Sequence, residues 1–272
     1  MKRIINQHPE RLGRILVGIL PFVLILIAYV VASEARLAIN PNDPVLPSFQ
    51  KMAETMHRLM FVPNVRTGEL LFWQDTGASL ARIGTAMMYT TLFGLMFGLL
   101  VGMVPWARAT LAPTLAMVSM IPPLAILPIL FIMLGLGELS KVALITLGTT
   151  PMLIRNLAMR VEELPHEQII KAQTLGASSW QLMLRVVLPQ LTPRLMDGLR
   201  LSLGAAWLFL IAAESVASTE GLGFRIFLVR RYLAMDTILP YVAWITLLAV
   251  TADYLLRVMA RKLFPWYGQQ AT

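Results

Sequence analysis

The chain has 272 residues, of which 57% are hydrophobic and 14% are charged. A soluble globular protein carries about 25% charged residues, so this composition excludes an ordinary soluble domain. The apolar residues form continuous runs rather than the alternating pattern of barrel strands, which predicts membrane-spanning helices. The net charge of +8 is typical of basic cytoplasmic loops. Cysteine is absent, and the widely separated His8, His57 and His166 disfavour a histidine metal site within the membrane.

The first predicted span covers residues 15–32 and follows a basic start at Lys2, Arg3, Arg11 and Arg14. A signal peptide also combines a basic start with an apolar run, and Val31-Ala32-Ser33 offers small residues for cleavage. The run is long for a signal peptide, so we expect a span that is not cleaved. The following residues 34–82 are polar and mixed, with prolines at 41, 44 and 47.

A short amphipathic helix is predicted after Ser48, which suits a helix cap. Its apolar residues recur at helical spacing: Phe49, Met52, Met56, Leu59 and Met60. The helix lies either on the membrane surface or on the protein's own loops.

The second and third predicted spans differ in their small residues and prolines. The second, residues 83–104, places Gly94, Gly98 and Gly102 on one face, which favours close helix packing. The third, residues 111–133, is interrupted by prolines at 113, 122, 123 and 128. Prolines bend helices and free carbonyl groups, so this span is either kinked or irregular and lines a solute pathway.

Three further spans are predicted at residues 142–154, 195–213 and 238–256. Six spans place both termini on one side. That side also collects most of the basic loops, so we expect it to be cytoplasmic. The predicted external loop 215–237 contains Arg225, Arg230 and Arg231, which contact a partner or an anionic solute, or are solvated.

The cytoplasmic stretch 162–189 reads as helix–glycine–helix. Pro165 and Glu167 are typical of a helix start, Gly176 of its end, and Ser178 or Ser179 of a second cap. The second helix carries Trp180 and is expected to stop at Pro189. Such an element suits docking into a groove on a soluble partner.

This stretch resembles the coupling motif of permease subunits in binding-protein-dependent ABC importers. Gly176 is followed, after nine residues, by Val186-Val187-Leu188-Pro189, and Ala172 matches an alanine of the motif. Ile170 replaces the family's acid, which puts its ion pair with the ATPase in doubt, and Lys171 replaces another alanine. Further similar pieces indicate the nitrate, sulfonate, taurine and bicarbonate branch: Ser79–Arg82, Ile121–Pro128, Gly135–Glu138, Ala212–Glu214, Gly221–Gly223 and Pro265-Trp266.

The resemblance implies an all-α integral membrane protein of about six transmembrane helices, with the type I ABC importer permease fold and functioning as a homodimer. Two ATP-binding subunits, which would hold ATP and Mg, and a periplasmic binding protein are the implied partners in a bacterial inner membrane. The chain lacks a Walker motif, so it is not expected to be the enzyme. Its implied solute is small and polar, such as nitrate, a sulfonate or taurine.

The implied ATPase-coupling residues are Glu167, Ala172, Leu175, Gly176, Ala177, Trp180, Leu188 and Pro189. The pathway or gate candidates are Pro122, Pro123, Ser202, Trp207 and Glu214. Glu214, at the outer end of the fifth span, lines a vestibule or holds a gate, or else lies at the interface in water. We divide the chain into an N-terminal part (1–78), a permease core (79–266) and a tail (267–272).

Three rival functions remain at this stage. A membrane enzyme would need clustered His, Asp or Glu near the interface, and none is evident. A passive channel would not need the helix–glycine–helix element. A membrane scaffold could in principle use it.

Overall fold

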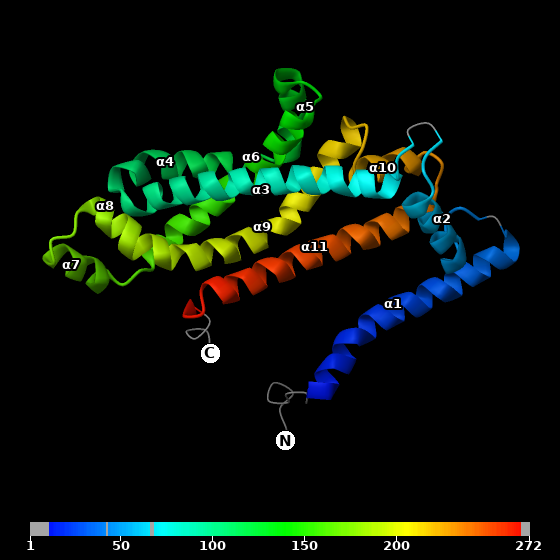
Figure 1. Cartoon of the computed structure of the whole chain (residues 1–272), viewed down its shortest axis with the longest axis horizontal. Coiled ribbons are helices and arrows are strands. Elements are labelled where there is room, and N and C mark those ends of the chain that lie inside the picture. The colour runs from blue at the N-terminus through cyan, green and yellow to red at the C-terminus, as the bar shows by residue number, and fades with distance from the viewer. Residues whose placement is uncertain (1–10, 42, 66–67, 268–272) are drawn as a thin grey trace.

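The computed structural model describes residues 11–41, 43–65 and 68–267. Lys2, Arg3, His8 and the tail residues 268–272 therefore lie outside the described residues. Every regular element in the described ranges is a helix (Figure 1). In order they are α1 (Arg11–Ile39), α2 (Phe49–Phe61), α3 (Leu71–Met103), α4 (Pro105–Val118), α5 (Pro123–Leu134), α6 (Glu138–Glu162), α7 (His166–Thr174), α8 (Ser179–Gln181), the π-helix η2 (Leu182–Val187), α9 (Leu188–Val216), α10 (Leu222–Arg230) and α11 (Met235–Leu263).

Five segments of the described chain are long and apolar enough to cross a membrane: Leu16–Ile39, Leu71–Met103, Glu138–Glu162, Ser179–Val216 and Met235–Leu263. Helices α4 and α5 form a sixth candidate only as a pair, and a 95° bend separates them. The predicted all-helical architecture of about six spans is thus confirmed, with the third span broken.

The break in the third span follows from Pro122 and Pro123. Proline lacks a backbone N–H, and it disfavours helical geometry in the residue before it. Pro122 becomes the N-cap of α5 and Pro123 its first residue. Pro113 and Pro128 lie inside α4 and α5 without ending them.

Several predicted boundaries are wrong because charged residues lie inside the long helices. Helix α3 begins at Leu71 rather than at residue 83. Ser79, where we began the permease core, is therefore inside this helix. Helix α6 continues to Glu162 instead of ending near residue 154. The predicted loop 215–237 contains helix α10. Charges such as Asp75 and Arg82 are tolerated in a span because both are buried against partners.

The predicted amphipathic helix is confirmed as α2. The Ser48 hydroxyl accepts a hydrogen bond from Lys51 N at 3.2 Å and caps it. Its apolar face packs on the protein's own core, beside α3 and α11, and Thr55 donates to Asp236 at 2.8 Å. The helix thus packs on other helices rather than on loops, and its position relative to the membrane surface stays a prediction.

The glycine face of α3 packs directly on α6. A Cβ atom on Gly94, Gly98 or Gly102 would lie 2.6–2.7 Å from Leu153, Leu157 or Val161. These approaches are too close for any other residue, so the predicted close packing is confirmed. Leucines of α3, α6 and α9 continue this contact into a buried apolar cluster at the end of the bundle that carries α7.

Helix α1 diverges from the bundle in Figure 1 and is joined to it mainly near its C-terminal end. The Tyr29 hydroxyl donates to Pro47 O at 2.7 Å, and the Ser33 hydroxyl donates to Leu46 O at 3.0 Å. Only 6% of the most apolar stretch of α1 is buried, and the same holds for α11. Both helices thus present long apolar faces, as lipid or another chain would require.

Candidate functional site

The segment predicted to couple to a partner lies at one end of the bundle, here called the α7 end; the opposite end is called the α10 end (Figure 1). Helix α7 begins after Pro165 and ends before Gly176, whose φ of 79° is readily reached only by glycine. Ser178 then forms a capping box with Gln181. The predicted helix start, glycine turn and serine cap are all confirmed.

The second helix does not stop at Pro189. It passes from α8 through η2 into α9, so it is continuous with the membrane-spanning helix. The wider π turn bonds Leu188 N to Met183 O, and Pro189 then occupies the first turn of α9, where its missing N–H costs little. The predicted stop is wrong because proline ends a helix only where its N–H is required.

The outer surface of this segment is unusually apolar. Side chains of Ile170, Leu175 and Trp180 are 57%, 84% and 65% exposed. Together with the exposed Glu167, they form what we call the docking surface. Of the other predicted coupling residues, Gly176 and Pro189 are exposed, whereas Ala172, Ala177 and Leu188 are half-buried.

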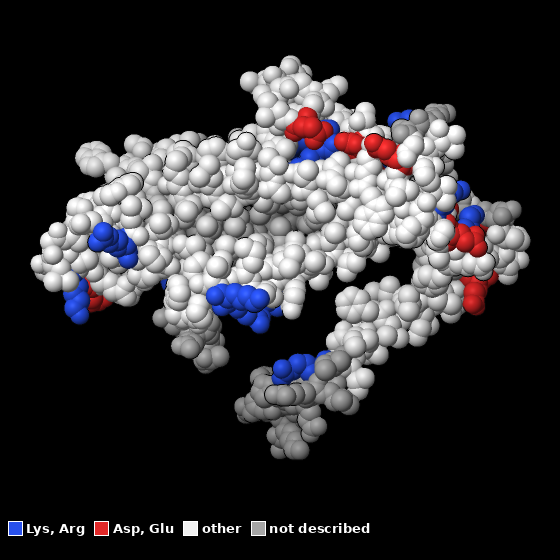
Figure 2. Space-filling view, viewed as in Figure 1, with Lys and Arg blue, Asp and Glu red and all other residues white. Residues whose placement is uncertain are grey.

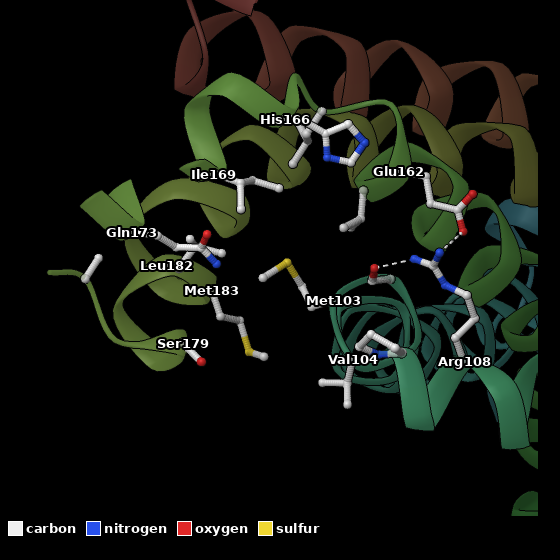
Figure 3. Close-up of a pocket in the computed structure, with 15 residues that line it drawn as sticks. Met103, Val104, Arg108, Glu162, His166, Ile169, Gln173, Ser179, Leu182 and Met183 are labelled. Atoms are coloured by element: carbon white, nitrogen blue, oxygen red, sulfur yellow. Dashed lines mark hydrogen bonds and ion pairs between the residues drawn. The ribbon is translucent and has the colours of Figure 1, made fainter. Parts of the chain in front are cut away.

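A cavity of about 700 Å³ lies beneath the segment, between the α3–α4 corner and α7, α8 and η2 (Figure 3). Ile169 and Gln173 of α7 and Met183 of η2 face Met103 across it in Figure 3. Along its wall Arg108 pairs with Glu162 at 2.9 Å and also donates to the carbonyls of Val101 and Gly102, at the end of α3. Helix α7 therefore covers a hollow on one side and exposes apolar side chains on the other.

The α10 end contains a cluster of buried charges. Asp75, Ser79 and Arg82 lie on one face of α3, at positions i, i+4 and i+7. With Glu214 of α9 they form what we call the α10 polar cluster. Three successive backbone N–H groups donate to it: Gly221 N to Asp75 at 2.9 Å, Leu222 N to Ser79 at 2.9 Å and Gly223 N to Glu214 at 2.8 Å.

Arg82 connects the α10 polar cluster to α6 and to the loop before α10. Its guanidinium pairs with Glu214 at 2.7 Å, pairs with Glu138, and donates to Glu220 O at 2.9 Å. Lys141 adds a second cation on Glu138 at 2.8 Å. Figure 2 shows acidic and basic side chains gathered beside α5. Four elements from distant parts of the sequence are thereby held together.

Glu214 is fully buried and accepts hydrogen bonds from Ser79, Arg82 and Gly223. The alternative that it lies in water at the interface is therefore wrong within this chain. Ser202 is buried and donates to Gly198 O, and Trp207 is buried in the core with no hydrogen-bond partner for Nε1 among the described residues. Pro122 and Pro123 lie at the bend between α4 and α5.

Arg225 is not a solvated external charge. It pairs with Asp75 at 2.7 Å, and Tyr241 also donates to that carboxylate at 3.1 Å. Burial lowers the pKa of Arg225, but the hydrogen bond and charge of Asp75 outweigh burial, so its pKa lies above the ordinary value. Arg230 lies 4.8 Å over the Phe227 ring. Arg225 is thus poorer evidence for an anionic solute than the sequence suggested, whereas Arg230 and Arg231 are exposed.

Sequence reasoning missed Asp75, Lys141 and Tyr241 as members of this arrangement. Two of them could have been noticed in the sequence: Asp75 lies one helical turn before Ser79, and Lys141 lies at the edge of the predicted span 142–154. Among the described residues, His, Cys, Asp and Glu side chains form no group of three that could hold a metal ion.

Comparison with known proteins tests the resemblance to ABC importer permeases that the sequence motifs indicated. Residues 90–267 match the family described as binding-protein-dependent transport system inner membrane component. The chain belongs to this family. One relative, the taurine transport system permease protein TauC of Escherichia coli (strain K12), is 38% identical over 197 residues, which cover 72% of each chain.

Other relatives of this permease are named for related solutes. The bicarbonate transport system permease protein CmpB of Synechococcus elongatus is 32% identical over 77% of this chain and 74% of its own. The putative aliphatic sulfonates transport permease protein SsuC of Bacillus subtilis is 29% identical over 76% of this chain and 75% of its own. The predicted branch of the family is confirmed.

Solved structures share the fold. A chain of the MetNI methionine ABC transporter, in an inward-facing conformation, matches with a TM-score of 0.60 at 19% identity and covers 74% of this permease and 97% of that chain. A chain of a bacterial ABC transporter for alginate import matches with a TM-score of 0.60 at 11% identity and covers 93% of this permease and 99% of that chain. The predicted ABC importer permease fold is therefore confirmed.

Proposed function

We propose that two copies of this permease form the translocation pathway of an ATP-driven importer for a small oxyanion-bearing solute, and that a separate ATPase docks on the α7 end. ATP and Mg²⁺ are bound by that ATPase, and a periplasmic binding protein delivers the solute to the α10 end. Membership of the transport family and relatives named for taurine, sulfonates and bicarbonate support this assignment.

The observation that carries the proposal is the docking surface. Ile170 and Leu175 expose large apolar side chains before the Gly176 turn, outside the long helices, and Trp180 exposes another in α8, at the start of the helix that continues into α9. Exposed apolar groups outside a membrane mark protein interaction sites. A short exposed helix with an adjoining aromatic suits insertion into a groove on a soluble subunit.

The same surface fixes the proposed orientation. The α7 end lies on the cytoplasmic side, where the ATPase is, and both termini lie on that side of a bacterial inner membrane. The exposed cations Arg160, Lys171 and Arg185 at the α7 end support this orientation, because cytoplasmic segments are enriched in Lys and Arg. The apolar faces of α1 and α11 are available to lipid and to the second copy.

Co-purification with the ATPase subunit tests the docking surface. Replacing Leu175 and Trp180 together by Ala should weaken ATPase binding at least about tenfold, because buried aromatic anchors dominate interface energies. The matched control is Trp73→Ala at the α10 end, where Trp73 is 48% exposed. This control should bind the ATPase normally.

Unchanged binding by the Leu175→Ala/Trp180→Ala variant, with the same thermal unfolding midpoint as the wild type, would contradict the proposal. The alternative that the chain is a passive channel predicts a different result. A channel would conduct its solute without the ATPase, so uptake that needs neither ATP nor the ATPase subunit would favour the channel.

A further inference from the structure

Arg155 is a charged residue on a membrane-spanning helix for which the fold provides no opposite charge. It lies on α6, seven positions before the last residue, Glu162, and so roughly 10 Å inside the end of the helix. A charge at such depth is costly unless it faces a partner or a water-filled cavity. Its side chain is exposed within this single chain, so it lies at a surface of the bundle that a ligand can reach.

Its neighbours do not neutralise it. Among the described residues, no carboxylate oxygen lies within 4.0 Å of the Arg155 guanidinium; its hydrogen bond goes to the Ser119 hydroxyl, at 2.8 Å. The Ser119 hydroxyl donates in turn to Ala116 O at 2.9 Å, so it orients the guanidinium and has no hydrogen left for a ligand. By contrast, Arg82, Arg200 and Arg225 each pair with an acid.

Arg155 faces a cavity of about 490 Å³ at the bend between α4 and α5. Asn156 lines the same cavity and, within the described chain, has no hydrogen-bond partner for its amide. Pro123, the first residue of α5, forms another part of the wall, which places a helix N-terminus with its partial positive charge at the cavity. The remaining wall is apolar and includes Val118, Leu147, Met152, Ala205 and Phe209.

These groups together suit an anion with an apolar tail. The planar guanidinium can bind two oxygens of one oxyanion, and the amide of Asn156 supplies a further donor. The cavity lies within the usual range for small-molecule sites, about 300–1,000 Å³, and its apolar wall leaves room for a short alkyl group. Of the pathway candidates named from the sequence, Pro123 is one that lines it.

The geometry points to an oxyanion subsite in this cavity, where Arg155 and Asn156 bind the sulfonate or carboxylate group of the solute as it passes. The assignment deepens the proposed function and rests on it for the identity of the ligand as a transported solute. A phospholipid headgroup offers the same chemistry, so the experiment must separate the two sources.

Thermal unfolding of the full-length permease in phosphatidylcholine nanodiscs tests binding without requiring transport. Sodium ethanesulfonate should raise the unfolding midpoint by about 3 °C over sodium chloride of equal ionic strength. Arg155→Gln should abolish this shift and Arg155→Lys should keep part of it. The matched control Arg160→Gln, on the same helix but paired with Glu163, should keep all of it.

Three results would overturn the subsite. The wild type could show no shift, Arg155→Gln could keep the shift, or phosphatidylglycerol alone could reproduce an Arg155-dependent shift without ethanesulfonate. The last result would assign the residue to lipid.

Uptake by the assembled importer provides a second arm. Arg155→Gln should lower uptake of labelled ethanesulfonate or taurine at least about tenfold, with normal ATPase binding. If the wild-type permease failed to bind the ATPase, the proposed function would be contradicted. The rise in unfolding midpoint with ethanesulfonate in nanodiscs does not depend on that outcome.

Discussion

At the scale of single residues, the α10 polar cluster shows why charges occur inside the long helices. Asp75 and Glu214 are completely buried, and each carboxylate accepts hydrogen bonds from three residues, one of which donates through its backbone N–H. Removing one partner from a buried ion pair strands the other charge and costs more than the pair itself contributes. The cluster therefore stabilises one position of α10 against α3 and α9.

Glu214→Gln tests this arrangement. The substitution keeps the shape but removes the charge that faces Arg82, so we expect the free energy of unfolding to fall by about 3 kcal/mol. Denaturant unfolding in detergent micelles measures the change. The matched control is Glu163→Gln, whose half-exposed carboxylate pairs with Arg160 and Arg194. It should change stability by less than about 1 kcal/mol, and equal losses in both variants would argue against the buried pair.

At the scale of elements, helix α3 combines two distinct faces. Its N-terminal part presents Asp75, Ser79 and Arg82 to α10, and its C-terminal part presents three glycines to α6. The glycine at 98 is the clearest case, because an added Cβ would lie 2.7 Å from the Cβ of Leu157, which cannot move without its backbone. The distance between α3 and α6 is thus determined by residues that have no side chain.

Gly98→Ala should separate these two helices and lower the free energy of unfolding by about 1–3 kcal/mol. Gly84→Ala, on the same helix, is the control, because no atom lies within 4 Å of its added Cβ. That change should be neutral or stabilise the protein by up to about 1 kcal/mol, since alanine favours helix. Denaturant unfolding of both variants under one set of conditions measures the contrast. A Gly98→Ala variant as stable as Gly84→Ala would exclude close packing as the role of Gly98.

At the scale of the whole molecule, the two ends carry different surfaces. The α7 end exposes the apolar docking surface, whereas the α10 end carries buried charges that hold a short helix in place. In Figure 1 the start of α1 and the end of α11 lie on the same side of the molecule, in agreement with an even number of crossings if α4 and α5 count as one. The proposed function requires these ends to lie on opposite sides of the membrane.

Labelling with an impermeant maleimide tests that requirement, because the chain has no cysteine of its own. Val65→Cys, at a fully exposed position between α2 and α3, should react from the outside of intact cells. Thr174→Cys, exposed at the end of α7, should react only after the membrane is permeabilised, in a chain expressed without its ATPase. Reaction of both cysteines from outside would contradict the proposed orientation.

Local sequence was sufficient for some elements and insufficient for others. The Ser48 cap of α2, the Gly176 turn and the bend at Pro122-Pro123 were all predictable, because each depends on the backbone preference of residues at that position. The continuation past Pro189 was not predictable, because it depends on a π turn several residues earlier. The extra length of α3 was missed because the residues that neutralise Arg82 lie 56 and 132 positions away.

The sequence by itself determined that this is a helical membrane protein of a binding-protein-dependent transport family, since apolar runs and a glycine-to-proline spacing are local properties. Only the tertiary structure decided which charges are neutralised. Arg225, for which the sequence left a partner, an anionic solute or solvent open, is paired with Asp75. Arg155, which looked like an ordinary span end, has no acidic partner in the described chain and faces a cavity. The physical reason is that the cost of a charge within a membrane depends on what lies within a few ångströms of it, and those neighbours come from other helices.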